Sequence, residues 1–379
     1  MTEPAAPGED ELFNPELATP AWRRRLKASD TGRLAAMLYR RRRVPAQLLR
    51  APGGLRGKPL PAPDPAARRR VRCVVWVPAG PGALDGVLAA WESVQASSPG
   101  EVALLVTDDW SPDAHADAIT AHIPEALVVR PRFPSGGPPR LWPVTALAVA
   151  TALRHFDFDL LVKFDADALV TGPGVVDALV SAIASAQSDA VAVGAEDAGT
   201  PAAALASAVP VGIGGAFITR PDGAEETDRD YHRRVLDGEV PHDDQLAAWE
   251  RAARESGWPP GAIVQGSCVV MTRAYCAALA DAGALTYRQR LRTIVSEDLL
   301  LTMLAYALGF RAASFGGPRG PLAIANKHLP LPLDELVDPE SPWLVAHSTR
   351  VGLDGESENE VRRRASLARE RWPQPTAAR

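Results

Sequence analysis

The stretch DLLVKFDADALVTGPG, from Asp159 to Gly174, decides the fold of this chain. It begins with the apolar run Leu160-Leu161-Val162, which is typical of a strand buried on both faces of a sheet. The run ends at Phe164-Asp165-Ala166-Asp167, and a Gly-Pro-Gly turn follows. Apolar strands alternate with helical patterns on the N-terminal side of this stretch. We therefore predict an α/β fold with a mostly parallel sheet.

The two carboxylates that follow this strand are the first functional signal. Side chains at positions i and i+2 of an extended backbone point the same way, so Asp165 and Asp167 can converge on one ion. Two carboxylates at the exit of a buried strand are costly to desolvate without a cation or hydrogen-bond donors. Mg²⁺ and Mn²⁺ prefer such oxygen ligands, completed by water and phosphate. The pattern predicts a metal-diphosphate site, and the competing interpretation is a pair of surface aspartates that cap the next helix.

The composition is that of a globular protein. Of 379 residues, 46% are hydrophobic and 23% charged, and no apolar run reaches the length of a membrane span. The acidic start, Met1 to Pro20, has no apolar stretch of the kind found in signal peptides. The three cysteines lack metal-ligand spacing and predict reduced core thiols. We expect a cytoplasmic protein that does not bind nucleic acid.

A basic arm precedes an acidic body. Trp22 to Arg72 contains 16 Lys and Arg but two acids, whereas Cys73 to Arg379 has a net charge of −14. One interpretation is peripheral contact of residues 22–72 with an anionic membrane surface on the inner face. The other, which we favour, is packing on the acidic body, because a helix with three apolar residues is a weak membrane anchor. The Pro- and Gly-rich segment from Pro45 to Ala67 is expected to be a linker.

The predicted strands and helices place several polar groups at one edge of the sheet. The expected strands are Val71 to Val77, Glu101 to Val106, Leu127 to Val129, Ala190 to Val193 and Pro210 to Arg220, and the expected helices are Leu84 to Ala96, Leu141 to His155 and Val175 to Ala186. In such folds the binding sites lie at the carboxyl ends of the strands.

The loop after the first strand supports a rival function. Gly80 to Gly86 resembles a dinucleotide fingerprint with one extra residue, and Asp108 ends the second strand where a ribose-binding acid would lie. An NAD(P)-dependent Rossmann oxidoreductase therefore stays open. Against it, the glycine spacing is wrong and Pro81 removes an amide that should face a pyrophosphate. Asp108 can equally accept hydrogen bonds from the ribose or base of a nucleotide sugar. A phosphatase that uses the Asp-x-Asp motif is a minor alternative, since Leu169 does not fit its pattern.

Three later segments carry polar residues in the same kind of setting. Ala262 to Thr272 predicts a strand broken at Gly266-Ser267, where a backbone without side chains can pass close to a sugar. Glu297 and Asp298 precede a helix that runs through Leu308, and acids in a first helical turn are also ordinary partners of the helix dipole. The segment Trp343 to Arg350 predicts a short strand that delivers His347, whose imidazole is a potential metal ligand.

Taken in order, these motifs resemble the four shared elements of glycosyltransferases with the GT-A fold: Asp165-Ala166-Asp167, Gly266-Ser267, Ser296-Glu297-Asp298 and His347. The likeness spans Val71 to Arg350. It implies a GT-A-type, Rossmann-like, mostly parallel sheet flanked by helices in a single catalytic domain at 68–350. Its nucleotide-binding half would be about 68–170 and its acceptor half about 171–350. The basic arm and linker at 1–67 and a C-terminal helix and tail at 351–379 would flank this domain.

The resemblance also implies roles for single residues. Asp167, with His347 and Asp165, would hold Mn²⁺ or Mg²⁺ against the diphosphate of a nucleotide-sugar donor. Asp298 would take the proton from an acceptor hydroxyl in a single displacement with inversion, and Glu297 would position the acceptor or that helix end. The remaining donor contacts would be Asp108, Ala166, Gly266 and Ser267, with Arg140 and Lys163 as candidate diphosphate contacts.

Several points stay open at this stage. A retaining reaction and a non-catalytic nucleotide-sugar-binding protein are alternatives to the inverting enzyme. The acceptor could be a natural product, a glycan, a lipid-linked intermediate or a protein. The sequence does not name the sugar, the nucleotide or the oligomeric state.

Overall fold

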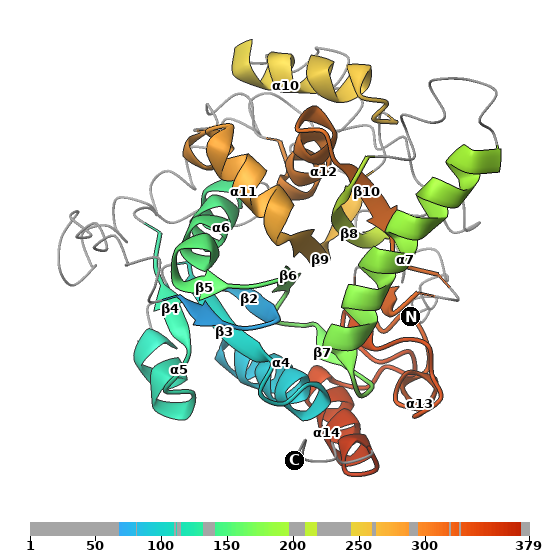
Figure 1. The fold of residues 1–379 in the computed structure, drawn as a ribbon. Helices are drawn as coiled ribbons and strands as arrows, with labels where there is room; N and C mark the ends of the chain where they lie inside the picture. The colour runs from blue at the N-terminus through green and yellow to red at the C-terminus, as the bar shows by residue number, and fades with distance from the viewer. Residues whose placement is uncertain are drawn as a thin grey trace, which may run out of the picture. The chain divides into compact units, whose positions relative to one another are not determined.

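The apolar runs of the sequence form a seven-stranded sheet at the centre of the described structure (Figure 1). The strand order is β10-β8-β9-β6-β2-β3-β4. The bounds are β2 (Cys73–Ala79), β3 (Val102–Asp108), β4 (Leu127–Val129), β6 (Leu160–Phe164), β8 (Val211–Phe217), β9 (Val264–Thr272) and β10 (Arg311–Ser314). Among these strands, β9 alone runs antiparallel to its neighbours β6 and β8. The predicted mostly parallel α/β sheet is confirmed.

The computed structural model describes residues 68–80, 82–109, 111, 115–131, 141–196, 209–217, 244–259, 263–287, 295–317, 320–325 and 327–372, with only the backbone described at 189–196. All of them belong to one unit, Leu60–Pro131 with Gly137–Arg379. The basic arm and Arg140 lie outside the described residues, so both interpretations of the arm stay predictions. No helix among the described residues is long and apolar enough to cross a membrane.

Helices cover both faces of the sheet because side chains alternate along each strand. Val74 and Trp76 of β2 face a core shared with one group of helices, and Cys73, Val75 and Val77 face a core shared with another. The first group is α6 (Trp142–His155), α10 (Asp244–Glu255), α11 (Arg273–Asp281) and α12 (Glu297–Ala307); the second is α4 (Leu84–Ser97), α5 (His115–His122) and α7 (Val175–Glu196). Figure 1 shows α6 and α11 on the side of the sheet opposite α4.

A second, three-stranded sheet lies next to the central strand. It has the order β11-β12-β7, with β7 at Leu169–Val170, β11 at Leu322–Ile324 and β12 at Val345–His347. β12 pairs antiparallel with β7, with Val345 opposite Val170 and Ala346 opposite Leu169. This register places His347, the next residue of β12, beside the turn that connects β6 to β7. Helices α13 (Leu333–Leu336) and α14 (Glu358–Arg369) share the apolar core of this sheet.

The connections create a topological switch point at the centre of the large sheet. From β2 the chain moves to β3 and β4 on one side and then returns to β6 on the other side of β2. The three strands β2, β3 and β6 are parallel, so their carboxyl ends lie at one edge of the sheet. Ligands of open α/β sheets bind in the crevice at such a point.

Two local predictions are wrong. Ala190 to Val193 are not a strand but part of α7, which runs without glycine or proline from Val175 to Val193 and is rich in alanine. β9 is continuous through Gly266-Ser267 and pairs there with the residues that follow β6, although its pairing with β8 shifts register between Val264 and Val269. The remaining short elements are β1 (Arg69–Arg70), β5 (Phe156–Asp157) and η2 (Ala284–Thr286).

Candidate functional site

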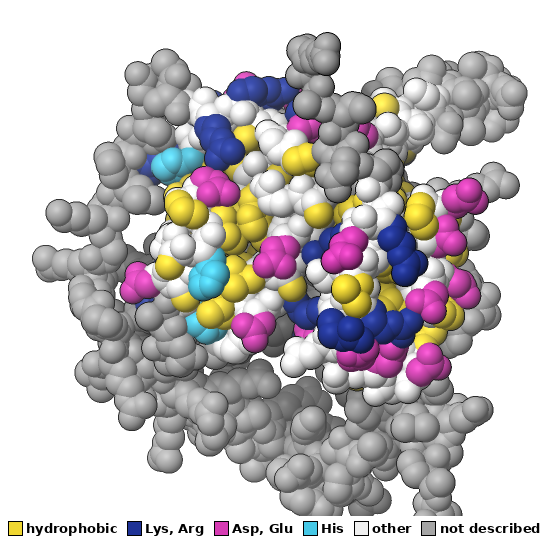
Figure 2. All heavy atoms as spheres, turned by 90° about the horizontal axis from the view of Figure 1, so that it is seen from below, with side chains coloured by type: hydrophobic (Ala, Val, Ile, Leu, Met, Phe, Trp, Pro, Cys, Tyr) yellow, Lys and Arg dark blue, Asp and Glu magenta, His cyan; other side chains and the backbone are white. Residues whose placement is uncertain are grey.

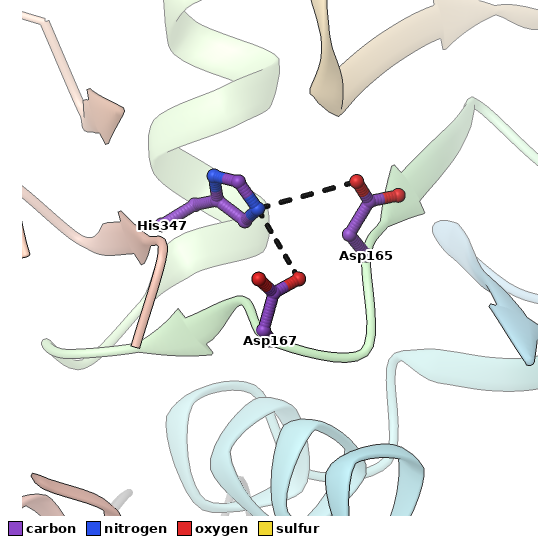
Figure 3. A group of neighbouring side chains, drawn as sticks. All are labelled: Asp165, Asp167 and His347. Atoms are coloured by element: carbon purple, nitrogen blue, oxygen red, sulfur yellow. Dashed lines mark hydrogen bonds and ion pairs between the residues drawn. The ribbon is translucent and has the colours of Figure 1, made fainter. Parts of the chain in front are cut away.

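Asp165, Asp167 and His347 point toward one another at the carboxyl end of β6 (Figure 3). Nε2 of His347 lies 3.2 Å from Oδ1 of Asp167 and 4.0 Å from Oδ2 of Asp165. One ligand atom from each of the three residues lies within 4.8 Å of the other two. The tertiary structure therefore brings His347 next to two aspartates that lie about half of the chain before it.

The backbone of the Asp165–Asp167 turn is fixed by hydrogen bonds. The amide of Asp165 donates to the carbonyl of Ser267 at 3.0 Å, which extends the pairing of β6 with β9. The carbonyl of Asp167 accepts from both the amide and the hydroxyl of Thr349, at 2.9 and 3.0 Å. The turn is thus held from β9 on one side and from the segment after β12 on the other.

The orientation of His347 suits a metal ligand. Its Nδ1 lies 2.8 Å from the carbonyl of Ala325, and a proton on Nδ1 satisfies this contact. Nε2 is then the nitrogen that faces the two carboxylates: it donates to Asp167 when it carries a proton, and it can bind a cation when it does not. Two carboxylates and one imidazole nitrogen are a donor set that can hold a divalent cation.

Asp167 is stabilised as a carboxylate by its neighbours. Burial by itself would raise its pKa, but the hydrogen bond and charge of His347, the hydroxyl of Ser348 and the guanidinium of Arg350 hold the pKa well below its ordinary value. Oδ2 accepts from Oγ of Ser348 at 2.7 Å and lies 2.7 Å from Nε of Arg350. Asp167 is therefore ionised throughout the physiological pH range.

Lys163, a candidate diphosphate contact from its sequence position, is buried inside the protein. Its side chain is 1% exposed, and its ammonium group lies 2.8 Å from Asp165 and 3.7 Å from Glu297 and donates to the carbonyl of Gly266. Burial alone would lower its pKa, but the charges of Asp165 and Glu297 outweigh burial and raise it. Lys163 is an internal cation that links two groups of acids, and it is not placed as a diphosphate contact.

Glu297 and Asp298 form the first turn of α12 beside Gly266. A Cβ on Gly266 would lie 3.2 Å from Oε1 of Glu297 and 3.5 Å from Cβ of Asp298, so glycine permits this close approach. Burial raises the pKa of Glu297 to about 7 despite the opposing charge of Lys163. A continuous set of contacts, through Lys163 and Gly266, thus joins the Asp165–Asp167 turn to the acids of α12.

A cavity of about 510 Å³ opens at the switch point. It is lined by Pro78, Ala79, Gly80, Gly82, Ala83, Asp85, Gly86, Asp109, Leu141, Val144, Asp165, Ala166, Asp167, Arg350, Glu358, Asn359 and Arg362. Asp165 and Asp167 reach this cavity. His347 and Asp298 are not among the lining residues; His347 contacts the Asp165–Asp167 turn directly, and Asp298 lies beside Gly266 and Lys163.

Asp108 does not line the cavity, but its neighbour Asp109 does. The Asp108 side chain is fully buried; Oδ1 accepts from the amide of Ser111 at 2.9 Å, and Oδ2 accepts from Nε of Arg130 at 3.1 Å. At the end of β3 the structure therefore presents Asp109 to a ligand, while Asp108 organises the loop.

The packing of α4 against the Asp165–Asp167 turn requires a glycine at the end of the loop after β2. A Cβ on Gly86 would lie 2.5 Å from the carbonyl oxygen of Ala166, so the first turn of α4 touches the Asp165–Asp167 turn. This contact explains the third glycine without a bound pyrophosphate.

Four polar residues of the cavity wall, all later in the chain than His347, were not identified from the sequence. Arg350 lies three positions after His347, a proximity that could have drawn attention to it. Glu358, Asn359 and Arg362 lie on α14, in the segment 351–379 that the sequence placed outside the catalytic domain. No motif marks these three, because only the packing of α14 brings them to the cavity.

Neither a family model nor a curated protein matches this sequence. The solved structures similar to the chain include the mannosyltransferase PcManGT from Pyrobaculum calidifontis in complex with GDP-Man and Mn²⁺, at 20% identity and a TM-score of 0.32, covering 77% of this chain and 65% of that one. They also include residues 1–349 of TarS from S. aureus in complex with UDP-GlcNAc, at 15% identity and a TM-score of 0.32, covering 64% and 56%.

The galactosyltransferase LgtC, in complex with donor and acceptor sugar analogues, is similar at 11% identity and a TM-score of 0.37, covering 80% of this chain and 98% of LgtC. This chain spans less than two thirds of the length of PcManGT and of TarS 1–349. TM-scores of 0.32 to 0.37 are too low to support an inference about function, which has to come from the geometry of the site.

Proposed function

We propose that this chain is a metal-dependent glycosyltransferase that moves a sugar from a nucleoside-diphosphate sugar to an acceptor hydroxyl. The observation that carries the proposal is the convergence of Asp165, Asp167 and His347 beside a cavity at the switch point. The contacts of Lys163 and Gly266 with the first turn of α12 bring Asp298 into the same region.

The cavity has the properties that a nucleotide sugar requires. Its volume of about 510 Å³ suits a ligand of that size. Arg350 gives it an exposed guanidinium next to Asp167, and Arg binds phosphate oxygens through its paired donors. Leu141 and Val144 give the cavity wall an apolar part against which a base can lie.

Asp165, Asp167 and His347 would hold the cation, which we propose to be Mn²⁺ or Mg²⁺. When bound, such an ion acts as a Lewis acid toward the departing diphosphate. The imidazole nitrogen favours Mn²⁺, since Mg²⁺ selects oxygen ligands more strictly.

We assign the proton transfer to Asp298. Its carboxylate would take the proton from the acceptor hydroxyl while that oxygen attacks the anomeric carbon from the face opposite the nucleotide. The bond from the anomeric carbon to the diphosphate oxygen breaks as the new bond forms, so the configuration inverts. Glu297, buried against Lys163, would hold this end of α12 in place.

An oxidoreductase remains the second candidate, because the glycine loop at Gly80 and Gly82 lines the same cavity. A thermal-shift panel separates the two functions. We expect UDP or GDP to raise the melting temperature only when Mn²⁺ or Mg²⁺ is present. Stabilisation by NAD(P) without metal, and none by nucleoside diphosphates, would favour the oxidoreductase.

Activity measurements test the role of Asp298 and the stereochemistry of the transfer. We expect Asp298→Asn to retain metal-dependent donor binding and to lose at least about 100-fold in transfer rate, since general-base catalysis contributes this much. Unchanged turnover in that variant would remove Asp298 from the mechanism. The anomeric coupling of the early product, measured by proton NMR, distinguishes inversion from retention.

A further inference from the structure

The C-terminal helix α14 sends one arginine inward to the turn that carries the metal ligands. We propose that Arg362 is a positioning residue, which holds the Asp165–Asp167 turn in the conformation that binds a divalent cation. This inference rests on the proposed function for the metal site itself, and it adds a residue and an element that neither the motifs nor the trio of ligands includes.

Arg362 is tied to three backbone carbonyls at once. Its Nη2 donates to the carbonyl of Ala166 at 2.8 Å, and its Nη1 lies 3.4 Å from the carbonyls of Asp85 and of Gly86. Glu358, one turn earlier on α14, accepts from Nε at 3.1 Å and orients the guanidinium. The Arg362 side chain is 11% exposed, so these contacts are largely shielded from water.

The two arginines that follow Arg362 on this helix pair with acidic side chains instead. Arg363 is 61% exposed and pairs with Glu360, and Arg364 pairs with Glu356 and Asp334. Figure 2 views the side of the molecule that carries α4 and α14, where basic and acidic side chains are intermixed. The exposed Arg363–Glu360 pair contributes little to stability. Arg362 differs from these two arginines because it donates to the backbone of the Asp165–Asp167 turn.

The position of the Ala166 carbonyl explains why Arg362 should affect the binding of a divalent cation. Ala166 lies between the two carboxylate ligands, and the turn is already fixed at its ends through Ser267 and Thr349. Arg362 fixes the middle and joins it to the first turn of α4, which lies against the same carbonyl at Gly86. With all three points fixed, Asp165 and Asp167 are held toward each other before an ion arrives. A flexible turn would have to be ordered at the expense of binding affinity.

The test measures metal binding by the full-length protein without any donor. We expect Arg362→Gln to weaken Mn²⁺ binding about tenfold, equal to about 1.4 kcal/mol, as measured by the electron paramagnetic resonance signal of free Mn²⁺. Arg363→Gln is the matched control, since it removes a neighbouring guanidinium that contacts Glu360 only. The control should bind Mn²⁺ like the wild type.

A purely structural role for Arg362 gives a different result. In that case Arg362→Gln would lower the melting temperature of the metal-free protein but leave the Mn²⁺ dissociation constant unchanged, and the inference would be wrong. Under the proposal, the activity lost by the variant returns at saturating Mn²⁺, so the metal requirement changes more than kcat.

If Arg362→Gln does not fold, Glu358→Gln frees the same guanidinium with less disruption and should weaken Mn²⁺ binding in the same direction. Unchanged affinity in Glu358→Gln would then overturn the inference. If the wild type itself binds no Mn²⁺, the proposed metal site fails, which is a result distinct from failure of the role of Arg362.

Discussion

Asp167 combines the features of a metal ligand and of a buried structural anion. Its carboxylate accepts a hydrogen bond from Ser348, forms an ion pair with Arg350 and lies 3.2 Å from Nε2 of His347, and its carbonyl accepts from Thr349. Hydrogen bonds to a ligating carboxylate fix its orientation, and losing them weakens metal sites by about 10- to 100-fold. A carboxylate held in this way does not have to reorganise when the cation binds.

Substitution of this ligand tests the site most directly. We expect Asp167→Asn to abolish the Mn²⁺-dependent rise in melting temperature produced by a nucleoside diphosphate and to reduce transfer at least about 100-fold. The reason is that the amide supplies neither the charge nor the second oxygen. Asp281→Asn, at the exposed end of α11, is the control and should behave like the wild type. Full metal-dependent binding in Asp167→Asn would show that the cation lies elsewhere.

Substitution of Lys163 tests whether its ammonium group links Asp165 to Glu297. Lys163→Met removes the cation that neutralises Asp165 and Glu297 inside the protein. At pH 8, where Glu297 has released its proton, this substitution leaves the buried Glu297 carboxylate unpaired, and we expect a loss of about 3–5 kcal/mol in the free energy of unfolding. Urea denaturation measures this loss, with Lys327→Met as an exposed control. A loss no larger than that of the control would mean that water solvates these acids.

The raised pKa of Glu297 predicts a pH dependence of stability. Burial raises its pKa from the ordinary 4.5 to about 7, so the folded state binds a proton that the unfolded state has already released. The stability that this proton supplies is present below pH 4.5 and is lost as the pH rises through about 7. We expect this loss to reach up to about 3 kcal/mol.

Thermal melts from pH 4.5 to 8 in the presence of a metal chelator measure the effect. The wild type should lose stability over this range relative to Glu297→Gln, because the variant has no proton to release. Parallel curves for the two proteins would show that Glu297 titrates at its ordinary pKa.

At the scale of elements, the site depends on where α4 meets the turn after β6. The closest approach is at Gly86, where any side chain would meet the carbonyl of Ala166. Gly86→Ala would normally favour a helix, but here the added methyl group must push two backbones apart. We expect a loss of about 1–3 kcal/mol in stability together with weaker Mn²⁺ binding.

Glu92→Ala, at an exposed position of the same helix, controls for helix propensity. Chemical denaturation and Mn²⁺ titration of both variants would measure the two effects. If Gly86→Ala is as stable as this control, the contact between α4 and the turn is looser than the structure indicates.

At the scale of the whole molecule, the described residues form a seven-stranded sheet with helices on both faces. The apolar cores of the described residues extend from Val71 to Trp372. We therefore expect deletion of Met1 to Ala67 to change the melting temperature by less than about 3 °C and to leave donor hydrolysis intact. Calorimetry and a donor-hydrolysis assay measure the two outcomes. Loss of folding in the truncated protein would make the basic arm part of the core.

Much of the fold could be predicted because local patterns of apolar and polar residues indicate its strands and helices. The apolar run at Leu160 and the strands that precede it have the composition of a buried parallel sheet, and the structure contains them at nearly the predicted bounds. Predictions from short, ambiguous apolar runs were less reliable. Ala190 to Val193 were predicted as a strand from their alternating side chains, but the helix propensity of the longer segment places them in α7. Asp165 and Asp167 could be predicted as neighbours from their spacing, whereas His347 could be placed beside them only by resemblance.

By itself, the sequence determined the class of fold, the edge of the sheet where polar groups gather and the residue types that can hold a cation. Local periodicity and residue chemistry are sufficient for these. Only the tertiary structure decided that Lys163 is buried between Asp165 and Glu297, that Asp109 and not Asp108 faces the cavity, and that Arg362 reaches the Asp165–Asp167 turn. The position of Arg362 depends on the docking of α14, and the positions of Lys163 and Asp109 depend on the pairing of β6 with β9 and of β3 with β2. These are contacts between segments far apart in the chain.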